Sequence, residues 1–335
     1  MAELATNDII YPPREELLCK ECRNCVVITY DLETTGLCSD DEIVQIGAYA
    51  HVPSRELFSQ YVLPHRRRIH VDASAKIGLQ VCAGSLLDTR TNEVLPTVPE
   101  AEGLQQFLTW LSYQRADSHG VVLVSHGAIF LDIPVLMGAL WRHHMQQDFF
   151  EVVKGFCDSN AIFQEDKCKR HKSLSLQSLY EDIVGPRREV HRAEGDARDL
   201  HTLLLRHFNV ESLSLDIPML ERYTYTSPCM EHYAEWKLYL DVELVGLRNI
   251  VKDWKNQSER KKKIILKNLV AAGYNMQNVQ REYALSESKL QFKLRLKNNI
   301  QRMKNERESY LSDTAGVHIN EVVNTVVRYF TRAQQ

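Results

Sequence analysis

An apolar run that ends in two alternating carboxylates constrains this chain more than any other feature. Residues 26–37 read VVITYDLETTGL, so a β-branched stretch leads directly into Asp31 and Glu33. Side chains of a strand alternate between its two faces, and residues i and i+2 therefore share one face. The pattern predicts a buried strand over residues 26–30 whose end directs both carboxylates to the same side.

Two carboxylates on one face repel each other unless a cation or protons intervene. Mg²⁺ and Mn²⁺ suit Asp31 and Glu33 because hard cations prefer oxygen ligands. The alternative is that both are solvated residues at a strand end, which is a common arrangement. The pair alone leaves the two interpretations open.

The length and the charge distribution indicate more than one domain. A chain of 335 residues is longer than a single hydrophobic core usually organises. Residues 248–308 hold 16 Lys/Arg and 6 Asp/Glu, whereas residues 1–247 hold 23 and 36, within an overall net charge of −3. We expect a polar leader (1–24), an α/β domain (25–210) and a basic helical domain (211–335). The basic part is predicted to meet a polyanion, or to bind a protein partner or a second copy of the chain.

No feature directs the chain to a membrane or out of the cell. No apolar run approaches the roughly 18 residues that span a bilayer, and the N-terminus lacks the basic and apolar parts of a signal peptide. We expect an intracellular protein, nuclear or cytoplasmic. Cys19, Cys22 and Cys25 form the cluster CKECRNC, which fits either zinc-binding thiolates or free thiols.

Alternation and helical spacing predict an α/β sheet covered by helices, followed by an all-α region. Expected strands lie at 26–30, 41–52, 56–64, 121–125 and 152–158, and expected helices at 99–114, 133–145, 175–184 and 196–208. Beyond residue 228 the pattern is helical over 231–254, 258–273, 275–308 and 318–330.

Further acidic residues follow where a metal site needs them. Asp132 comes after the expected strand at 121–125 and is predicted to cap the helix that follows. His191 precedes Asp196 by five residues, and a short loop between them directs an imidazole and a carboxylate to one side of a pocket.

Three motifs in this order resemble the DEDDh family of 3′-to-5′ exonucleases, which have a ribonuclease H-like fold. The family includes polymerase proofreading subunits, three-prime repair exonucleases and the exonuclease-like domain of some PML proteins. DLETTG resembles its first motif, SHGAIFLDIPVL its second and HRAEGDA its third, and YVLPHRRRIHVDASAKIGL resembles its segment after the third strand. The resemblance covers about residues 26–208. It departs at Gly127, where the family usually has Asn.

The resemblance implies a two-metal phosphodiester hydrolase. Two Mg²⁺ or Mn²⁺ ions are expected on Asp31, Glu33, Asp132 and Asp196, clamping the attacking and leaving oxygens of an in-line displacement. His191 is the expected general base, since a histidine side chain ordinarily has a pKa near 6.5. These five residues form the expected catalytic set.

The resemblance also implies a pocket for the terminal nucleotide. Glu33 is expected to contact the terminal 3′-hydroxyl as well as a metal, and Leu37 to pack on the base. The other expected substrate-binding residues are Thr34, Thr35, Gly36, Ile77, Leu79 and His126, the last of which has a packing role as its alternative.

The leading hypothesis is a metal-dependent 3′-to-5′ exonuclease that releases nucleoside 5′-monophosphates from a nucleic acid with a single-stranded 3′ end. The alternative is a catalytically weak or inactive exonuclease-like module that binds nucleic acid or a protein partner. No motif distinguishes DNA from RNA, because that choice depends on how the pocket treats the 2′-hydroxyl.

Overall fold

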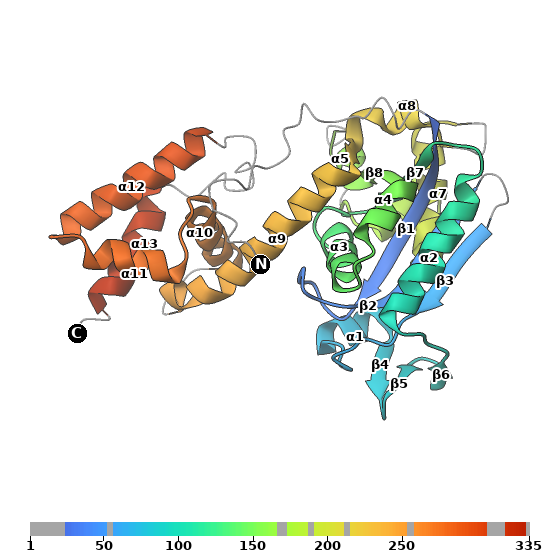
Figure 1. The fold of residues 1–335 in the computed structure, drawn as a ribbon, viewed down its shortest axis with the longest axis horizontal. Coiled ribbons are helices and arrows are strands. Elements are labelled where there is room, and N and C mark those ends of the chain that lie inside the picture. Colours follow the sequence, from blue (N-terminus) through green and yellow to red (C-terminus); the bar gives the residue numbers. More distant parts are fainter. Residues whose placement is uncertain are drawn as a thin grey trace. The chain divides into compact units, whose positions relative to one another are not determined.

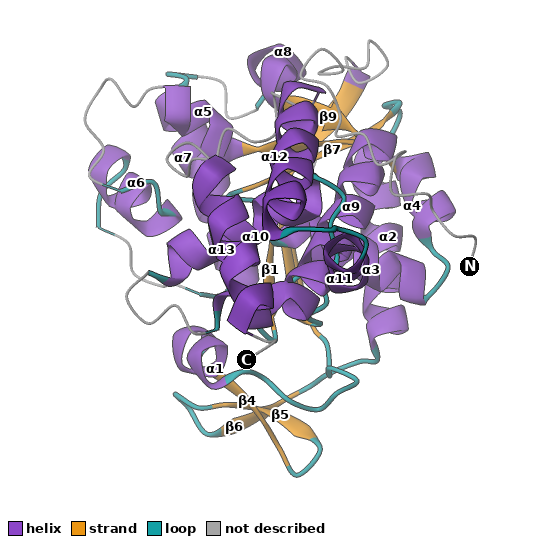
Figure 2. Cartoon of the chain, turned by 90° about the vertical axis from the view of Figure 1, so that its left-hand side faces the viewer, coloured by secondary structure: helices purple, strands orange, loops and turns teal. Residues whose placement is uncertain are grey.

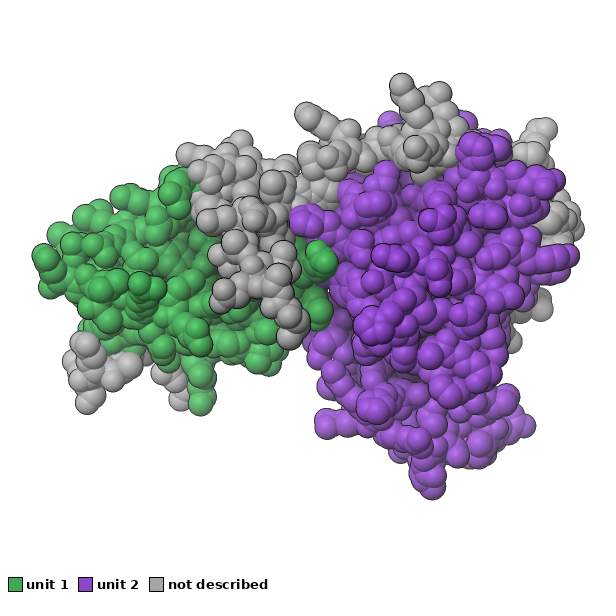
Figure 3. Space-filling model, in the orientation of Figure 1, with its two compact units in different colours: residues 1–14, 235–335 green, residues 15–234 purple. Residues whose placement is uncertain are grey.

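The computed structural model describes residues 24–51, 56–165, 173–186, 191–210, 215–252, 258–306 and 319–332. They form two compact units, one containing the described residues up to Ala234 and the other those from Glu235 onward (Figure 3). The domain boundaries expected after residues 24 and 210 stay predictions. Cys19 and Cys22, on which the zinc hypothesis depends, lie outside the described residues.

The first unit is built on a six-stranded mixed sheet with the strand order β3-β2-β1-β7-β8-β9 (Figure 1). β1 is parallel to β7 and β7 to β8, whereas β2, β3 and β9 each pair in antiparallel fashion. The strands are β1 Cys25–Thr34, β2 Ile43–Ala50, β3 Glu56–Tyr61, β7 Gly120–Ser125, β8 Val153–Asp158 and β9 Thr224–Thr226.

Helices cover both faces of this sheet, which agrees with the predicted α/β sheet covered by helices. Alternate residues of β1 divide between two apolar clusters: Ile28, Tyr30 and Leu32 pack with α2, α3 and α4, whereas Val27 packs with α5, α6 and α7. The helices are α2 Glu100–Arg115, α3 Asp132–Arg142, α4 Gln146–Val152, α5 Ser159–Glu165, α6 Leu176–Ile183, α7 Ala193–His207 and α8 Ile217–Leu220. Odd-numbered residues of β1 therefore face α7.

β1 is longer than the expected strand at 26–30, and its extra length carries the first motif. Its pairing with β7 ends at Thr29, opposite Val124, whereas its pairing with β2 continues to Thr34. Hydrogen bonds from β2 pair the backbone groups of this extension, so the strand continues beyond the end of its apolar run. Asp31 and Glu33 thus lie on a paired strand, beyond the end of β7.

A small three-stranded sheet, which the sequence analysis did not anticipate, follows β3. A short helix, α1 (Val71–Ile77), leads into the order β4-β5-β6, with bounds Leu79–Cys82, Ser85–Asp88 and Glu93–Leu95. Figure 2 shows this sheet and α1 together, apart from the main sheet. Its strands are only three or four residues long, too short for an alternating pattern to stand out in the sequence.

Gly47 lets α7 lie directly against β2. A methyl group at this position would come within 2.0 Å of the Ala193 carbonyl carbon and 2.1 Å of the Glu194 nitrogen. Gly47 is also the cross-strand partner of Asp31, so the close contact brings α7 beside the first motif.

We expect Gly47→Ala to lower the free energy of unfolding by at least the roughly 1–3 kcal/mol typical of overpacking, because backbone cannot yield as a side chain can. Thermal or urea unfolding measures the change. Gly246→Ala is the matched control: nothing lies within 4 Å of its added methyl, and alanine favours the helix. An equal stability of the Gly47 variant and the wild type would contradict the close packing.

The second unit is helical, as predicted. Its helices are the C-terminal part of α9 (Ser227–Leu247), α10 Glu259–Ala271, α11 Met276–Ala284, α12 Lys289–Glu306 and α13 Ile319–Arg332. The expected helical stretch 275–308 is divided, because Ser288 accepts a hydrogen bond from the Gln291 amide at 3.2 Å and starts α12. Among the described residues, no helix is both long and apolar enough to cross a membrane.

Candidate active site

Two residues of β2 hold the start of α7 beside the first motif. Gln45, opposite Glu33 in the strand register, is fully buried. Its side-chain oxygen accepts a hydrogen bond from the Ala193 amide at 3.2 Å, and its side-chain nitrogen donates to Glu194 Oε2 at 2.5 Å. Together with the close contact at Gly47, these bonds place the first turn of α7 next to Asp31 and Glu33.

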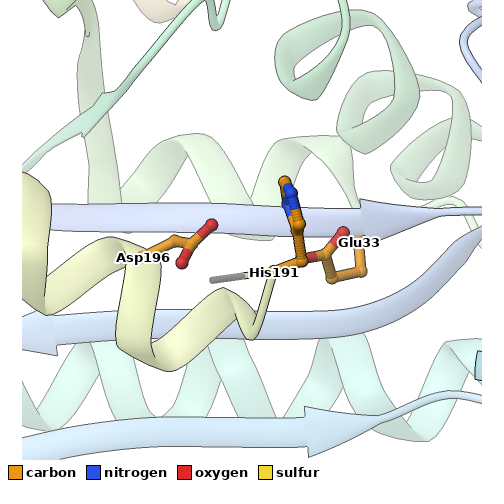
Figure 4. A group of neighbouring side chains, drawn as sticks. All are labelled: Glu33, His191 and Asp196. Carbon is orange, nitrogen blue, oxygen red and sulfur yellow. The ribbon is translucent and has the colours of Figure 1, made fainter. Parts of the chain in front are cut away.

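This attachment brings the first and third motifs together. Ligand atoms of Glu33, His191 and Asp196 all lie within 4.8 Å of one another (Figure 4). Glu33 comes from β1, Asp196 from the first turn of α7 and His191 from the residues just before it. Glu33 and Asp196 are buried, whereas His191 is partly exposed. Two carboxylates and an imidazole at this separation are suited to binding a divalent cation.

His191 has an unusual backbone conformation, and its neighbour Arg192 is anchored by distant residues. His191 has a φ of +59°, in the left-handed region that costs a non-glycine residue roughly 1–2 kcal/mol. Arg192 pairs with the buried carboxylate of Asp88 on β5 and donates to the Ile77 carbonyl at 3.4 Å. The small sheet therefore anchors the residue that separates His191 from α7.

The second motif approaches from the end of β7. Asp132 was expected to cap α3, and this prediction is wrong: it is the first helical residue, after Leu131, and no side chain caps the helix. Its carboxylate instead accepts a hydrogen bond from the Ser125 hydroxyl. Asp132 and Asp31 are not in the close group with His191, yet the charge of Asp132 contributes to the raised pKa of Glu33.

Asp158, at the end of β8, organises the loop of the second motif. Its carboxylate accepts hydrogen bonds from the amides of Gly127 at 2.8 Å, Asn160 at 2.9 Å and Ile129 at 3.3 Å. Gly127 has a φ of +79°, which glycine adopts without strain and asparagine tolerates less readily. The loop that leads to Asp132 is thus supported from a neighbouring strand.

His126 has internal partners for both ring nitrogens. Nδ1 lies 2.9 Å from the Ser159 hydroxyl and Nε2 lies 2.7 Å from the Leu174 carbonyl oxygen. These contacts favour the packing role over the substrate contact that was its alternative.

The loop after β1 is built around the buried carboxylate of Asp41. This carboxylate accepts hydrogen bonds from the Thr35 hydroxyl and the Cys38 amide, both at 2.8 Å. A methyl group on Gly36 would come within 2.5 Å of Asp41 Oδ2, so a larger residue there would displace the Asp41 carboxylate. The Thr35 amide donates to the Glu42 carbonyl at 2.9 Å, and the Thr34 hydroxyl donates to the Gly36 carbonyl at 2.6 Å.

The three apolar residues that were expected to contact the substrate differ in solvent exposure. Leu37 is 79% exposed at the tip of the loop, where it is accessible to a ligand. Ile77 and Leu79 are 4% and 0% exposed and pack with Val44 and Leu86. Leu37 is therefore the accessible member of the set.

Burial and mutual repulsion raise the pKa values of the carboxylates in this region. Burial, followed by the charge of Asp196, raises the pKa of Glu33 from 4.5 to about 8. Burial raises the pKa of Asp132 from 3.8 to about 7, although the hydrogen bond from Ser125 acts in the opposite direction. Burial also raises the pKa of Asp158. A divalent cation bound among these carboxylates would offset their negative charge. The residues present therefore fit a metal site.

We expect the metal-free protein to lose stability as the pH rises from about 5 to 8.5. The folded pKa values of Glu33 and Asp132, about 8 and about 7, exceed their ordinary values of 4.5 and 3.8. The folded state thus binds more protons than the unfolded state in this pH window. The stability that this binding contributes is lost as the pH rises through the pKa values of the folded state. Melting temperatures at pH 5.5 and 8.5, with EDTA or Mn²⁺, measure the effect. Mn²⁺ should raise the melting temperature more at pH 8.5 than at pH 5.5. Equal melting temperatures in all four conditions would contradict the link between stability and protonation of these carboxylates.

Sequence reasoning missed four supporting residues: Gln45, Asp41, Asp88 and Asp158. Each is polar and buried, and each bonds to a segment distant in the sequence or to a loop backbone. Asp158 carried a usable signal, since it ends an expected strand parallel to the one that precedes Asp132. The others have no such signal, because their partners become neighbours only in the folded chain.

Comparison with known proteins gives a family model for just under half of the chain. Residues 25–182 match the Exuperantia RNAse H-like domain, which confirms the ribonuclease H-like fold expected from the motifs. The chain is 27% identical over 180 residues to the maternal protein exuperantia of Drosophila virilis, covering 51% of this chain and 36% of that protein. It is 27% identical over 146 residues to the Drosophila melanogaster protein, covering 41% and 26%. The matched region thus spans about a third of these relatives or less.

Among solved structures, the nuclease domain of 3′hExo, a DEDDh family member bound to rAMP, is similar at 11% identity and a TM-score of 0.43, covering 57% of this chain and 94% of that one. Exonuclease I of E. coli in complex with single-stranded DNA is similar at 13% identity and a TM-score of 0.43, covering 70% and 46%.

Proposed function

We propose that this protein is a metal-dependent 3′-to-5′ exonuclease that releases nucleoside 5′-monophosphates from nucleic acid 3′ ends. The observation that carries the proposal is the meeting of Glu33, His191 and Asp196 within 4.8 Å, at the end of the central strand. The charge of Asp132, which raises the pKa of Glu33, supports its membership of the same site. A ribonuclease H-like fold over residues 25–182 is consistent with this chemistry.

Asp31, Glu33, Asp132 and Asp196 are the residues that would hold two Mg²⁺ or Mn²⁺ ions. When bound, such ions polarise the scissile phosphate and stabilise the attacking and leaving oxygens. The carboxylates bind and orient, and the burial of Glu33, Asp132 and Asp196 keeps bulk water from screening the charges of the site. Glu33 also accepts a hydrogen bond from the terminal 3′-hydroxyl.

His191 acts as the general base. In its neutral form it accepts the proton of the attacking water at a ring nitrogen, and the imidazolium is then stabilised by Glu33 and Asp196 beside it. The exposed side chain of Leu37 packs on the terminal base. The hydrogen bonds of the Thr34, Thr35 and Gly36 backbone and side chains hold that loop in shape.

A second candidate function is an exonuclease-like module that binds nucleic acid or a protein without cleaving. It is consistent with the match of residues 25–182 to the Exuperantia RNAse H-like domain and with the similarity to maternal protein exuperantia. This candidate predicts binding with no release of mononucleotide at any metal concentration. Partner binding or self-association through the C-terminal helices also stays a prediction.

The test is a degradation assay on matched single-stranded DNA and RNA carrying a 5′ label. With Mg²⁺ or Mn²⁺ we expect a ladder shortened from the 3′ end, and Asp31→Asn should abolish it. Running both polymers in one experiment reveals which sugar the pocket accepts. If every lane contains only full-length oligonucleotide and the protein still binds the oligonucleotide in EDTA, the second candidate function is correct and the proposed one is wrong. A ladder that persists in Asp31→Asn would instead show that the site is wrongly assigned.

A further inference from the structure

A basic segment lies directly against the loop of the first motif. Residues 64–70 read PHRRRIH and lead from β3 into α1. The Arg66 amide donates to Glu42 Oε2 at 3.0 Å, and the His70 amide donates to the Thr35 carbonyl at 2.8 Å. His70 Nε2 also lies 3.8 Å from Asp41 Oδ1. Backbone hydrogen bonds thus fix the segment to the loop that carries Thr35 and Leu37.

The side chains of this segment point to solvent with few fixed partners. His65, the three arginines 66–68 and His70 are all exposed. Arg66 pairs with Asp40 at 3.4 Å, but both side chains are more than half exposed, and such pairs contribute little. Arg67 donates to the Gly84 carbonyl at 3.0 Å. Arg68 has no hydrogen bond or ion pair with any residue that the structure describes.

The positive charge continues from this segment to the candidate active site. α1 follows at once, and its last turn carries Lys76, whose charge lowers the pKa of Glu33. This run contrasts with residues 25–210 as a whole, which hold 24 acidic and 18 basic side chains. A polyanion that approaches a group of carboxylates is repelled unless cations flank its path, and this segment supplies them.

We propose that Arg66 and Arg68, with Lys76, form the binding track for the phosphates on the 5′ side of the scissile bond of a single-stranded nucleic acid. This inference rests on the proposed function, because the 5′ side is defined by the bond that the active site would cleave. Flexible arginines that face water suit a phosphate backbone, because they neutralise charge without reading sequence.

The test compares two charge-matched variants of the full chain, Arg68→Glu and Arg206→Glu. Arg206 is exposed near the C-terminal end of α7, far along that helix from Asp196. Fluorescence anisotropy with a 5′-labelled ten-nucleotide single strand in EDTA measures binding without hydrolysis. We expect Arg68→Glu to weaken binding at least tenfold and Arg206→Glu to change it less than twofold. Equal losses in the two variants would overturn the proposal, because only net charge would then matter.

A salt titration and a small substrate separate this proposal from the proposed function. The double variant Arg66→Gln/Arg68→Gln should reduce the slope of log affinity against log salt by about 1.4, roughly 0.7 for each lost phosphate contact on a single strand. An unchanged slope would also overturn the track. The nitrophenyl ester of thymidine 5′-monophosphate has no further phosphates, so the double variant should lose much less of its ester hydrolysis than of its oligonucleotide trimming, and equal losses on both substrates would overturn the track. If the wild type hydrolyses neither substrate, the proposed function fails, and the anisotropy comparison still decides the binding track.

Discussion

Glu33→Gln is expected to abolish 3′-end trimming while it makes the metal-free protein more stable at pH 8.5. The carboxylate is 7% exposed, and its pKa is raised to about 8 by burial and by the charge of Asp196. At pH 8.5 the wild type must keep a buried charge beside like charges, whereas glutamine has nearly the same shape and no charge. Removing that repulsion should raise the melting temperature in EDTA by a few degrees.

On the proposed function, the same substitution removes a charged metal ligand, and an amide oxygen replaces the carboxylate that accepts from the terminal 3′-hydroxyl. We expect the rate of trimming to fall by roughly 10³-fold or more, comparable with the loss of a group that stabilises transition-state charge. The stabilisation by Mn²⁺ that is expected of the wild type should also largely disappear. Gain of metal-free stability together with loss of metal response distinguishes a ligand from a residue that merely supports the fold.

Glu102→Gln provides the matched control. Glu102 is exposed on α2, where its carboxylate accepts a hydrogen bond from the Gln106 side chain at 3.1 Å. Its variant should keep the wild-type rate, the wild-type melting temperature and the full response to Mn²⁺. A Glu33→Gln protein that trims at the wild-type rate, or that is less stable than the wild type in EDTA at pH 8.5, would refute the site as described.

His191→Gly should remove catalysis without unfolding the protein. A positioned general base contributes roughly 10²–10⁴-fold, so we expect a loss of that size in the trimming rate. Residue 191 has a φ of +59°, which glycine adopts more easily than histidine, so the backbone should not suffer. Added imidazole should restore part of the activity by occupying the space that the side chain leaves.

Metal response decides between the two roles that the geometry allows for His191, since its ring lies as close to the carboxylates as a ligand would. A base predicts that Mn²⁺ still stabilises His191→Gly, whereas a ligand predicts that this stabilisation is lost. His144→Gly is the matched control, because His144 is exposed after α3 and has a φ of +55°. Activity that survives in His191→Gly, or that imidazole does not raise at all, would remove His191 from the mechanism.

The five longer strands of the main sheet, four of its covering helices and the identity of the clustered residues could be predicted from the sequence. Alternation over VVITYDLE places Asp31 and Glu33 on one face of a strand wherever that strand lies. The run of strands and helices predicted a sheet covered on both faces, and the described residues confirm it. These inferences succeed because they depend on period and on local spacing, which a single sequence records.

Elements whose limits depend on a neighbour were predicted less well. β1 runs to Thr34 because β2 pairs with its extension, and no apolar residue marks that end. α7 begins at Ala193, before the expected residue 196, because Gln45 on β2 binds the Ala193 amide. Asp132 turns to Ser125 instead of capping α3, because burial at the end of β7 offers it a hydroxyl partner.

The sequence by itself determined which side chains are able to form a site: the carboxylates, their spacing and the histidine before α7. The tertiary structure decided that Glu33, His191 and Asp196 meet, through the contact of α7 with Gly47 and the bonds of Gln45. It also decided that Asp158 holds the second motif and that Asp88 holds Arg192. The physical reason is that hydrogen bonds and close contacts between distant segments depend on the packing of whole layers, which no local pattern encodes.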